Sequence, residues 1–214
     1  MTALHIDPTV FLVDDDAAVR SALRRGLVAE GFNVRLFESA DAFLAEYDSG
    51  LPGCLIADVA MPGMSGLELQ SLMAARGYAR PIIFITGKGS IPMSVQAMRA
   101  GAVTFLSKPV RLGELAAAVR EAFERDRRWR EEYAERTEVE SRLSALTSRE
   151  REVLELIVIG KLNKQIAAEL GAAEKTIKVH RGRVMAKLNV RSVAELVNLT
   201  ARVIRRTESR SRAG

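Results

Sequence analysis

The sequence predicts an α/β domain with a doubly wound, five-stranded parallel sheet, followed by a second domain that is all α-helical. Two observations predict this arrangement. Short apolar runs alternate with amphipathic helical segments five times before residue 125, and beyond it only helical periodicity is visible. The net charge also changes, from −2 over residues 1–125 and −1 over residues 126–145 to +8 over residues 146–214. We therefore predict a domain at 1–125, a helical linker at 126–145 and a basic domain at 146–214.

The five predicted strands are short and apolar, as strands buried inside a parallel sheet are. They are Thr9–Val13, Val34–Phe37, Cys54–Ala57, Pro81–Ile85 and Ala102–Leu106. Right-handed crossovers between such strands predict a flavodoxin-like sheet with the order 2-1-3-4-5. In that order, the carboxyl ends of the first, third, fourth and fifth strands share one edge.

The helices between the strands show apolar residues about four positions apart, which is the period of one helical face. Glycine follows the first and the last of them, and Ser65 and Glu68 form a capping box at the third. The predicted helices are Ala17–Glu30, Ser39–Tyr47, one that begins at Ser65, and Met93–Ala100.

A long helix is predicted to join the two domains. Leu112–Phe123 is amphipathic, and the charged run Glu124–Arg142 continues it without Gly or Pro. We interpret the charges of this run as a solvated face.

Four helices are predicted in the basic domain. A Thr147–Glu150 capping box opens the first, and Asn163 is expected to cap the short helix Lys164–Leu170. Glu174–Leu188 and Ser192–Ile204 follow. Two short helices around a glycine turn, the second of them basic, are typical of a helix-turn-helix whose second helix enters the major groove of DNA.

Four strand ends bring polar groups of a chemically related kind to the shared edge of the sheet. These groups are Asp14 and Asp15, Asp58, Thr86 and Lys108. Carboxylates about 4 Å apart repel by ~4 kcal/mol at an effective dielectric near 20, so they require a cation or a proton between them. Because no Cys/His cluster accompanies them, Mg²⁺ fits better than a soft metal. Given a phosphate donor, one carboxylate can then act as the nucleophile while the metal and Lys108 neutralise the transferred phosphoryl group.

The residues of this site resemble the receiver domain of bacterial two-component response regulators. The resemblance rests on VDDD at Val13–Asp16, ADVAMPGMSGLEL at Ala57–Leu69 and ITGKGSIPMSVQAMRAGAVTFLSKP at Ile85–Pro109. It implies the following roles: phosphoacceptor, Asp58; Mg²⁺ ligands, Asp14, Asp15, Asp58 and the backbone carbonyl of Ala60; switch residues, Thr86 and Phe105; phosphoryl-binding cation, Lys108. It also implies a cis Lys108–Pro109 peptide bond.

The segment Thr147–Val197 resembles the LuxR-type output domain, and together the two matches resemble the FixJ-like branch of the NarL/FixJ family. By position, the resemblance implies that Lys178 and Val179 face base edges. It implies backbone or further basic contacts to DNA from Lys164, Thr176, Arg181, Arg183 and Lys187.

Two departures from the LuxR-type pattern affect the recognition helix. Ala173 stands where the pattern often has Ser, so a cap that contributes ~1 kcal/mol is missing. Gly182 lowers helix propensity by up to ~1 kcal/mol and replaces a contacting side chain.

These observations lead us to expect a phosphorylation-gated transcription regulator rather than an enzyme with substrate turnover. A sensor histidine kinase would phosphorylate Asp58, and the segment Met93–Phe105 would then form a homodimer that binds double-stranded DNA half-sites. RNA polymerase is a further candidate partner. One alternative is a constitutive DNA-binding protein whose receiver is only a dimerisation scaffold. Another is a Mg²⁺-dependent aspartyl-nucleophile phosphatase, which usually requires a second acid where this chain has Ala60.

The sequence also indicates where the protein works. No apolar run approaches the ~20 residues of a membrane span, and no secretory signal is visible at the amino terminus. The single cysteine, Cys54, has no intrachain disulfide partner, which fits a reducing compartment. We expect a cytoplasmic protein without membrane contact.

Overall fold

A five-stranded, all-parallel sheet forms the centre of the first of two units in the computed structural model, which describes residues 6–78, 80–87 and 91–200. Its strands are β1 (Thr9–Val13), β2 (Asn33–Phe37), β3 (Gly53–Asp58), β4 (Ile82–Thr86) and β5 (Thr104–Ser107). They lie in the order β2-β1-β3-β4-β5, which confirms the predicted topology. The register pairs Val13 with Ala57, Asp58 with Ile85 and Thr86 with Ser107. The strands therefore end at a common edge, and β3 includes Asp58 as its last residue.

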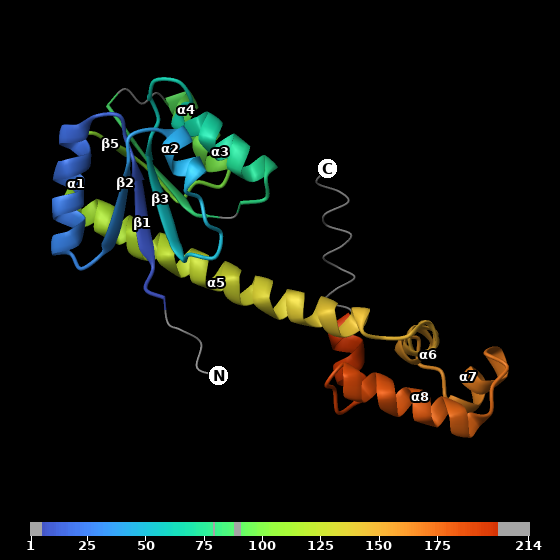
Figure 1. Ribbon diagram of the computed structural model, residues 1–214. Helices are drawn as coiled ribbons and strands as arrows, with labels where there is room; N and C mark the ends of the chain where they lie inside the picture. The colour runs from blue at the N-terminus through green and yellow to red at the C-terminus, as the bar shows by residue number, and fades with distance from the viewer. Residues whose placement is uncertain (1–5, 79, 88–90, 201–214) are drawn as a thin grey trace. The chain divides into compact units, whose positions relative to one another are not determined.

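Helices cover both faces of the sheet (Figure 1). Because side chains alternate along a strand, β1 sends Phe11 and Val13 to one apolar cluster and Val10 and Leu12 to the other. The first cluster lies under α2 (Ala40–Ala45), α3 (Gly66–Ala75) and α4 (Ile91–Arg99), and the second under α1 (Ala17–Ala29) and α5 (Leu112–Ser144). Both faces are buried, which explains why the strands are continuous apolar runs.

The first unit extends past the predicted boundary at residue 125, to Arg130. Asp126 on α5 is only 2% exposed, and its carboxylate accepts hydrogen bonds from the backbone N–H of Gly53 (2.8 Å) and from Arg130 Nε (2.8 Å). Arg130 also donates to the carbonyls of Gly50 and Leu51. The interpretation of the charged run as a solvated face is therefore wrong at Asp126 and Arg130, which fasten α5 to the start of β3.

Gly53 allows this attachment because its backbone occupies a region that favours glycine, with φ of 142°. A Cβ at this position would lie 1.9 Å from the carbonyl oxygen of Thr9. Only glycine lets β3 approach β1 this closely at the point where Asp126 binds.

The second unit comprises residues 131–214 and is helical throughout its described part. Its helices are α6 (Ser148–Val158), α7 (Asn163–Glu169), α8 (Glu174–Lys187) and a helical segment over residues 193–200. The core consists of apolar side chains from all four, among them Val153, Ile157, Ile166, Val184 and Leu196. The predicted last helix reaches Ile204, and its residues 201–204 lie outside the described residues.

Within the described ranges, every helix is too short or too polar to cross a membrane.

Candidate functional site

Three carboxylates meet at the carboxyl edge of the sheet, as predicted. Asp14 follows β1 and is fully buried, Asp58 ends β3 and is largely buried, and Asp15 is exposed. One carboxylate oxygen from each lies within 4.8 Å of the others. Oxygen donors at this spacing, with one member open to solvent, fit a hard divalent cation such as Mg²⁺.

Lys108 joins the two buried carboxylates of this cluster. Its Nζ lies 2.6 Å from Asp14 Oδ2 and 2.6 Å from Asp58 Oδ2. Its backbone N–H donates to the carbonyl oxygen of Thr86 (2.7 Å), and the Lys108–Pro109 peptide is cis as expected. A group bound to Asp58 would therefore meet this ammonium directly.

Burial and charge act in opposite directions on the titration of this site. Burial raises the pKa of Asp14, against hydrogen bonds from Lys108 and from the backbone N–H of Asp16. Burial alone would lower the pKa of Lys108, but its hydrogen bonds to Asp14 and Asp58 outweigh this effect and raise it. Lys108 is consequently a cation at neutral pH, and Asp14 is the strained member of the cluster.

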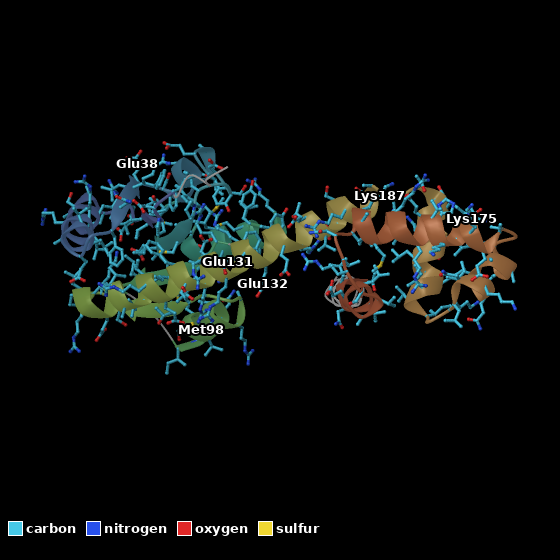
Figure 2. All side chains as sticks on the ribbon, turned by 90° about the horizontal axis from the view of Figure 1, so that it is seen from below. Glu38, Met98, Glu131, Glu132, Lys175 and Lys187 are labelled. Atoms are coloured by element: carbon cyan, nitrogen blue, oxygen red, sulfur yellow. The ribbon has the colours of Figure 1, made fainter. Side chains whose placement is uncertain are left out.

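The two predicted switch residues lie on neighbouring strands. Thr86 is buried at the end of β4, and Phe105 is half-buried on β5. The Phe105 ring packs in the cluster under α2–α4, with its centroid 6.4 Å from that of Phe84. On α4, the apolar side chains Val95 and Met98 are exposed (Figure 2).

Ala60 and two unpredicted contacts complete the surroundings of the acidic cluster. The backbone N–H of Ala60 donates to Asp58 Oδ1 (3.2 Å), while the role of its carbonyl as a metal ligand stays a prediction. Asp16 caps α1 by accepting from the N–H groups of Ala18 and Val19. Arg20 donates to the carbonyl oxygen of Asp14, a contact that no sequence pattern signalled.

The second unit presents a basic surface on its helix-turn-helix. On α8, Thr176, Lys178, Val179 and Arg183 are exposed, and so is Lys164 on α7. Ile177 and Val184 on the same helix are fully buried. Figure 2 shows Lys175 and Lys187 toward the two ends of α8. The division of α8 into an apolar inner face and a basic outer face matches the prediction.

Two of the predicted DNA-contacting side chains also bind within the unit. Arg181 Nη1 donates to Asn163 Oδ1 (3.1 Å), and Lys187 Nζ donates to Glu150 Oε2 (2.6 Å) and to the carbonyl of Ala145 (3.0 Å). The prediction that Asn163 caps α7 is wrong. The N-cap is Leu162, which has no side-chain cap bond, and Asn163 is the first helical residue. Its amide is engaged by Arg181 instead.

Comparison with known proteins identifies both units. Residues 10–120 match the family described as "Response regulator receiver domain", and residues 144–200 match "Bacterial regulatory proteins, luxR family". Nodulation protein W of Bradyrhizobium diazoefficiens is 45% identical over 89% of this chain and 84% of its own length. The chain belongs to the NarL/FixJ family of response regulators. It is thus a regulator with a receiver and a LuxR-type domain, related to regulatory proteins rather than to metabolic enzymes.

Solved structures of related response regulators span both domains. The structure of StyR covers 92% of this response regulator and 99% of its own chain, with 47% identity and a TM-score of 0.85. Full-length FixJ from B. japonicum covers 91% and 96%, with 38% identity and a TM-score of 0.55.

The missing cap of this response regulator's recognition helix leads to a stability prediction. Ala173 is the N-cap of α8 and makes no side-chain cap bond. Ala173→Ser should therefore stabilise the second unit by about 1 kcal/mol. Slower amide hydrogen exchange along α8 in the full chain would reveal this. Ala168→Ser, the same change at an exposed position inside α7, should bring no stabilisation. Equal exchange rates in wild type and Ala173→Ser would contradict the prediction.

The ion pair of Glu150 leads to a prediction about pH. Glu150 is buried, and its bonds from Lys187 and from the backbone N–H of Thr147 lower its pKa to about 2. A lowered pKa stabilises the folded state above the ordinary value of 4.5, and this stability is lost as the pH falls toward 2. Glu150→Gln should therefore lower the Tm at pH 7, and the difference from wild type should shrink at acidic pH.

Thermal unfolding followed by circular dichroism at several pH values measures this effect. Glu152→Gln, which removes an exposed carboxylate paired with Arg149, serves as the control and should leave the Tm nearly unchanged. A Tm difference for Glu150→Gln that is constant with pH would show that the ion pair is not its source.

Proposed function

We propose that this response regulator accepts a phosphoryl group on Asp58 from a sensor histidine kinase and then binds double-stranded DNA as a dimer to regulate transcription. One observation carries the proposal: Lys108 bridges Asp14 and Asp58 within a three-carboxylate cluster. The same chain contains a LuxR-type DNA-binding domain, so the chemistry of the cluster has an output. We place this activity in the cytoplasm.

Asp58 acts as the nucleophile in this proposal. Its carboxylate is oriented by Lys108 at Oδ2 and by the N–H of Ala60 at Oδ1. Asp14, Asp15, Asp58 and the carbonyl of Ala60 would hold Mg²⁺, which supplies positive charge to the oxygens of the transferred phosphoryl group. Lys108 exchanges its contact with the Asp58 carboxylate for one with a phosphoryl oxygen, so its charge stays neutralised throughout.

The signal then passes to α4 and β5. Thr86 donates its hydroxyl proton to a phosphoryl oxygen and moves toward Asp58, and Phe105 turns inward beside it. This movement reshapes the exposed face that carries Val95 and Met98, where a second copy binds. Dimerisation pairs two LuxR-type domains on neighbouring DNA half-sites.

DNA is bound mainly through the outer face of α8. Lys178 and Val179 read base edges, and phosphate contacts supply most of the affinity, at a salt-dependence slope of roughly −0.9 per neutralised phosphate. The phosphate contacts come from Lys164, Thr176, Arg181, Arg183 and Lys187. RNA polymerase is the candidate partner of the DNA-bound dimer.

Phosphorylation of the intact protein by acetyl phosphate tests the proposal. With Mg²⁺ present, we expect the mass to rise by one phosphoryl group, and peptide mapping should find it on Asp58. With EDTA in place of Mg²⁺, the modification should be nearly absent. A phosphoryl group on another residue, or equal labelling without a divalent ion, would overturn the assignment.

A further inference from the structure

A cavity of about 310 Å³ lies in the first unit, away from the acidic cluster. Its wall includes Pro81 and Ile82, where β4 begins, and Val103, which precedes β5. Asp58 and Thr86 stand at the opposite, carboxyl ends of the strands. Because a five-residue strand spans roughly 15 Å, the cavity and the acidic cluster are separate sites.

Most of the cavity wall is apolar and part of it is aromatic. Met73 on α3, Tyr78 after α3 and Trp129 on α5 contribute large side chains to it. The Tyr78 ring is stacked on the Tyr47 ring, with centroids 4.2 Å apart and an interplanar angle of 16°. The volume lies at the small end of the range of about 300–1,000 Å³ that is usual for ligand pockets, so it suits a molecule with one aromatic ring.

Among the described residues that line the cavity, both charged side chains are cations, Arg80 and Arg125. Arg80 is only 6% exposed, and its Nη2 donates to the carbonyls of Asp48 (2.8 Å) and Leu51 (3.1 Å). Its Nε and Nη1 are buried and have no hydrogen-bond partner in the described part of the chain. A buried guanidinium with unused donors is stabilised by a nearby negative charge.

The other polar side chain at the wall does not compete for an anion. Gln70 is buried, and its Nε2 donates to the carbonyls of Ala97 and Ala100 (both 3.2 Å). Arg125, by contrast, lies at an exposed position and pairs there with Glu121 (2.7 Å). It is therefore the accessible cation, while Arg80 adds positive charge from within the wall.

We propose that this cavity binds a small aromatic carboxylate, with the ring against Tyr78 and Trp129 and the carboxylate toward Arg80 and Arg125. The ligand would touch α5 as well as the amino ends of β4 and β5. Its binding would therefore stabilise the attachment of α5 to the first unit.

Trp129 makes the proposal testable in the full-length protein, because it is the single tryptophan of the sequence. Titration with phenylacetate should change its fluorescence saturably, with a Kd of about 0.1–1 mM for so small a ligand. Phenylacetamide, which has the ring without the charge, should bind at least about threefold more weakly. Equal binding of the amide, or no saturable change at millimolar phenylacetate, would overturn the proposal.

Matched variants locate the binding site. Arg125→Gln should weaken phenylacetate binding about threefold, whereas Arg128→Gln should not change it. Both arginines are exposed on α5 and each pairs with a glutamate four residues earlier, but only Arg125 lines the cavity. Ala74→Met, at an exposed position of the wall, should fill the cavity and abolish the signal. Equal behaviour of the two arginine variants, or unchanged binding in Ala74→Met, would place the ligand elsewhere.

Discussion

We expect Asp58→Asn to abolish the dimerisation that acetyl phosphate induces in the wild-type protein. The asparagine amide is not nucleophilic, so no phosphoryl group can be attached at this position. The substitution keeps the shape of the side chain and an oxygen that can accept from Lys108, which now lies 2.6 Å from Asp58 Oδ2. The fold should therefore survive. Light scattering should show wild type shifting from monomer to dimer while the variant stays monomeric.

A matched control separates loss of the phosphoacceptor from a general effect of charge. Asp41→Asn makes the same chemical change at an exposed position in the first turn of α2. It should dimerise with acetyl phosphate as wild type does. If Asp58→Asn dimerised to the same extent as Asp41→Asn, phosphorylation of Asp58 would not be the trigger.

Asp14→Asn is expected to have two opposite effects, a gain of stability without metal and a loss of Mg²⁺ binding. Burial raises the pKa of Asp14, so its ionised form destabilises the folded state above the pKa of the unfolded chain, near 3.8. Removing this charge should raise the free energy of unfolding at pH 7 by about 1 kcal/mol after loss of one contact with Lys108. The gain should disappear below about pH 4, where the carboxyl group of the wild type is protonated in both states.

The loss of metal binding is measured on the same variant by thermal unfolding. With a Kd near 1 mM, 10 mM Mg²⁺ would stabilise wild type by about 1.4 kcal/mol, and it should not stabilise Asp14→Asn. Glu38→Gln, a change of an exposed carboxylate on the same unit, should keep the full response to Mg²⁺. A stabilisation by Mg²⁺ that is as large in Asp14→Asn as in wild type would exclude Asp14 as a ligand.

The sequence predicted the acidic site well because the site follows from topology. Once alternating strands and helices are recognised, right-handed crossovers fix the strand order, and the strand ends must then converge. Asp14, Asp58, Thr86 and Lys108 each follow or end an apolar run, so their shared location needed no knowledge of side-chain packing. The structure brings them together as expected.

The attachment of α5 could not be predicted in the same way. Asp126 binds the backbone of Gly53, which lies 73 residues earlier in the chain. Nothing in a run of mixed charges distinguishes this carboxylate from its solvated neighbours, because its burial depends on a partner supplied by the fold. Asn163 illustrates the same limit, since a residue with good capping propensity was drawn to a side chain of another helix, Arg181.

The affinity of the full-length protein for DNA, with and without acetyl phosphate, tests the central claim most directly. A duplex obtained by binding-site selection from random DNA provides the ligand, and fluorescence anisotropy at fixed salt provides the measurement. If phosphorylation of Asp58 controls the LuxR-type domain, acetyl phosphate should tighten binding by at least about tenfold. An affinity that acetyl phosphate leaves unchanged would contradict this account and indicate a constitutive DNA-binding protein whose receiver is only a scaffold.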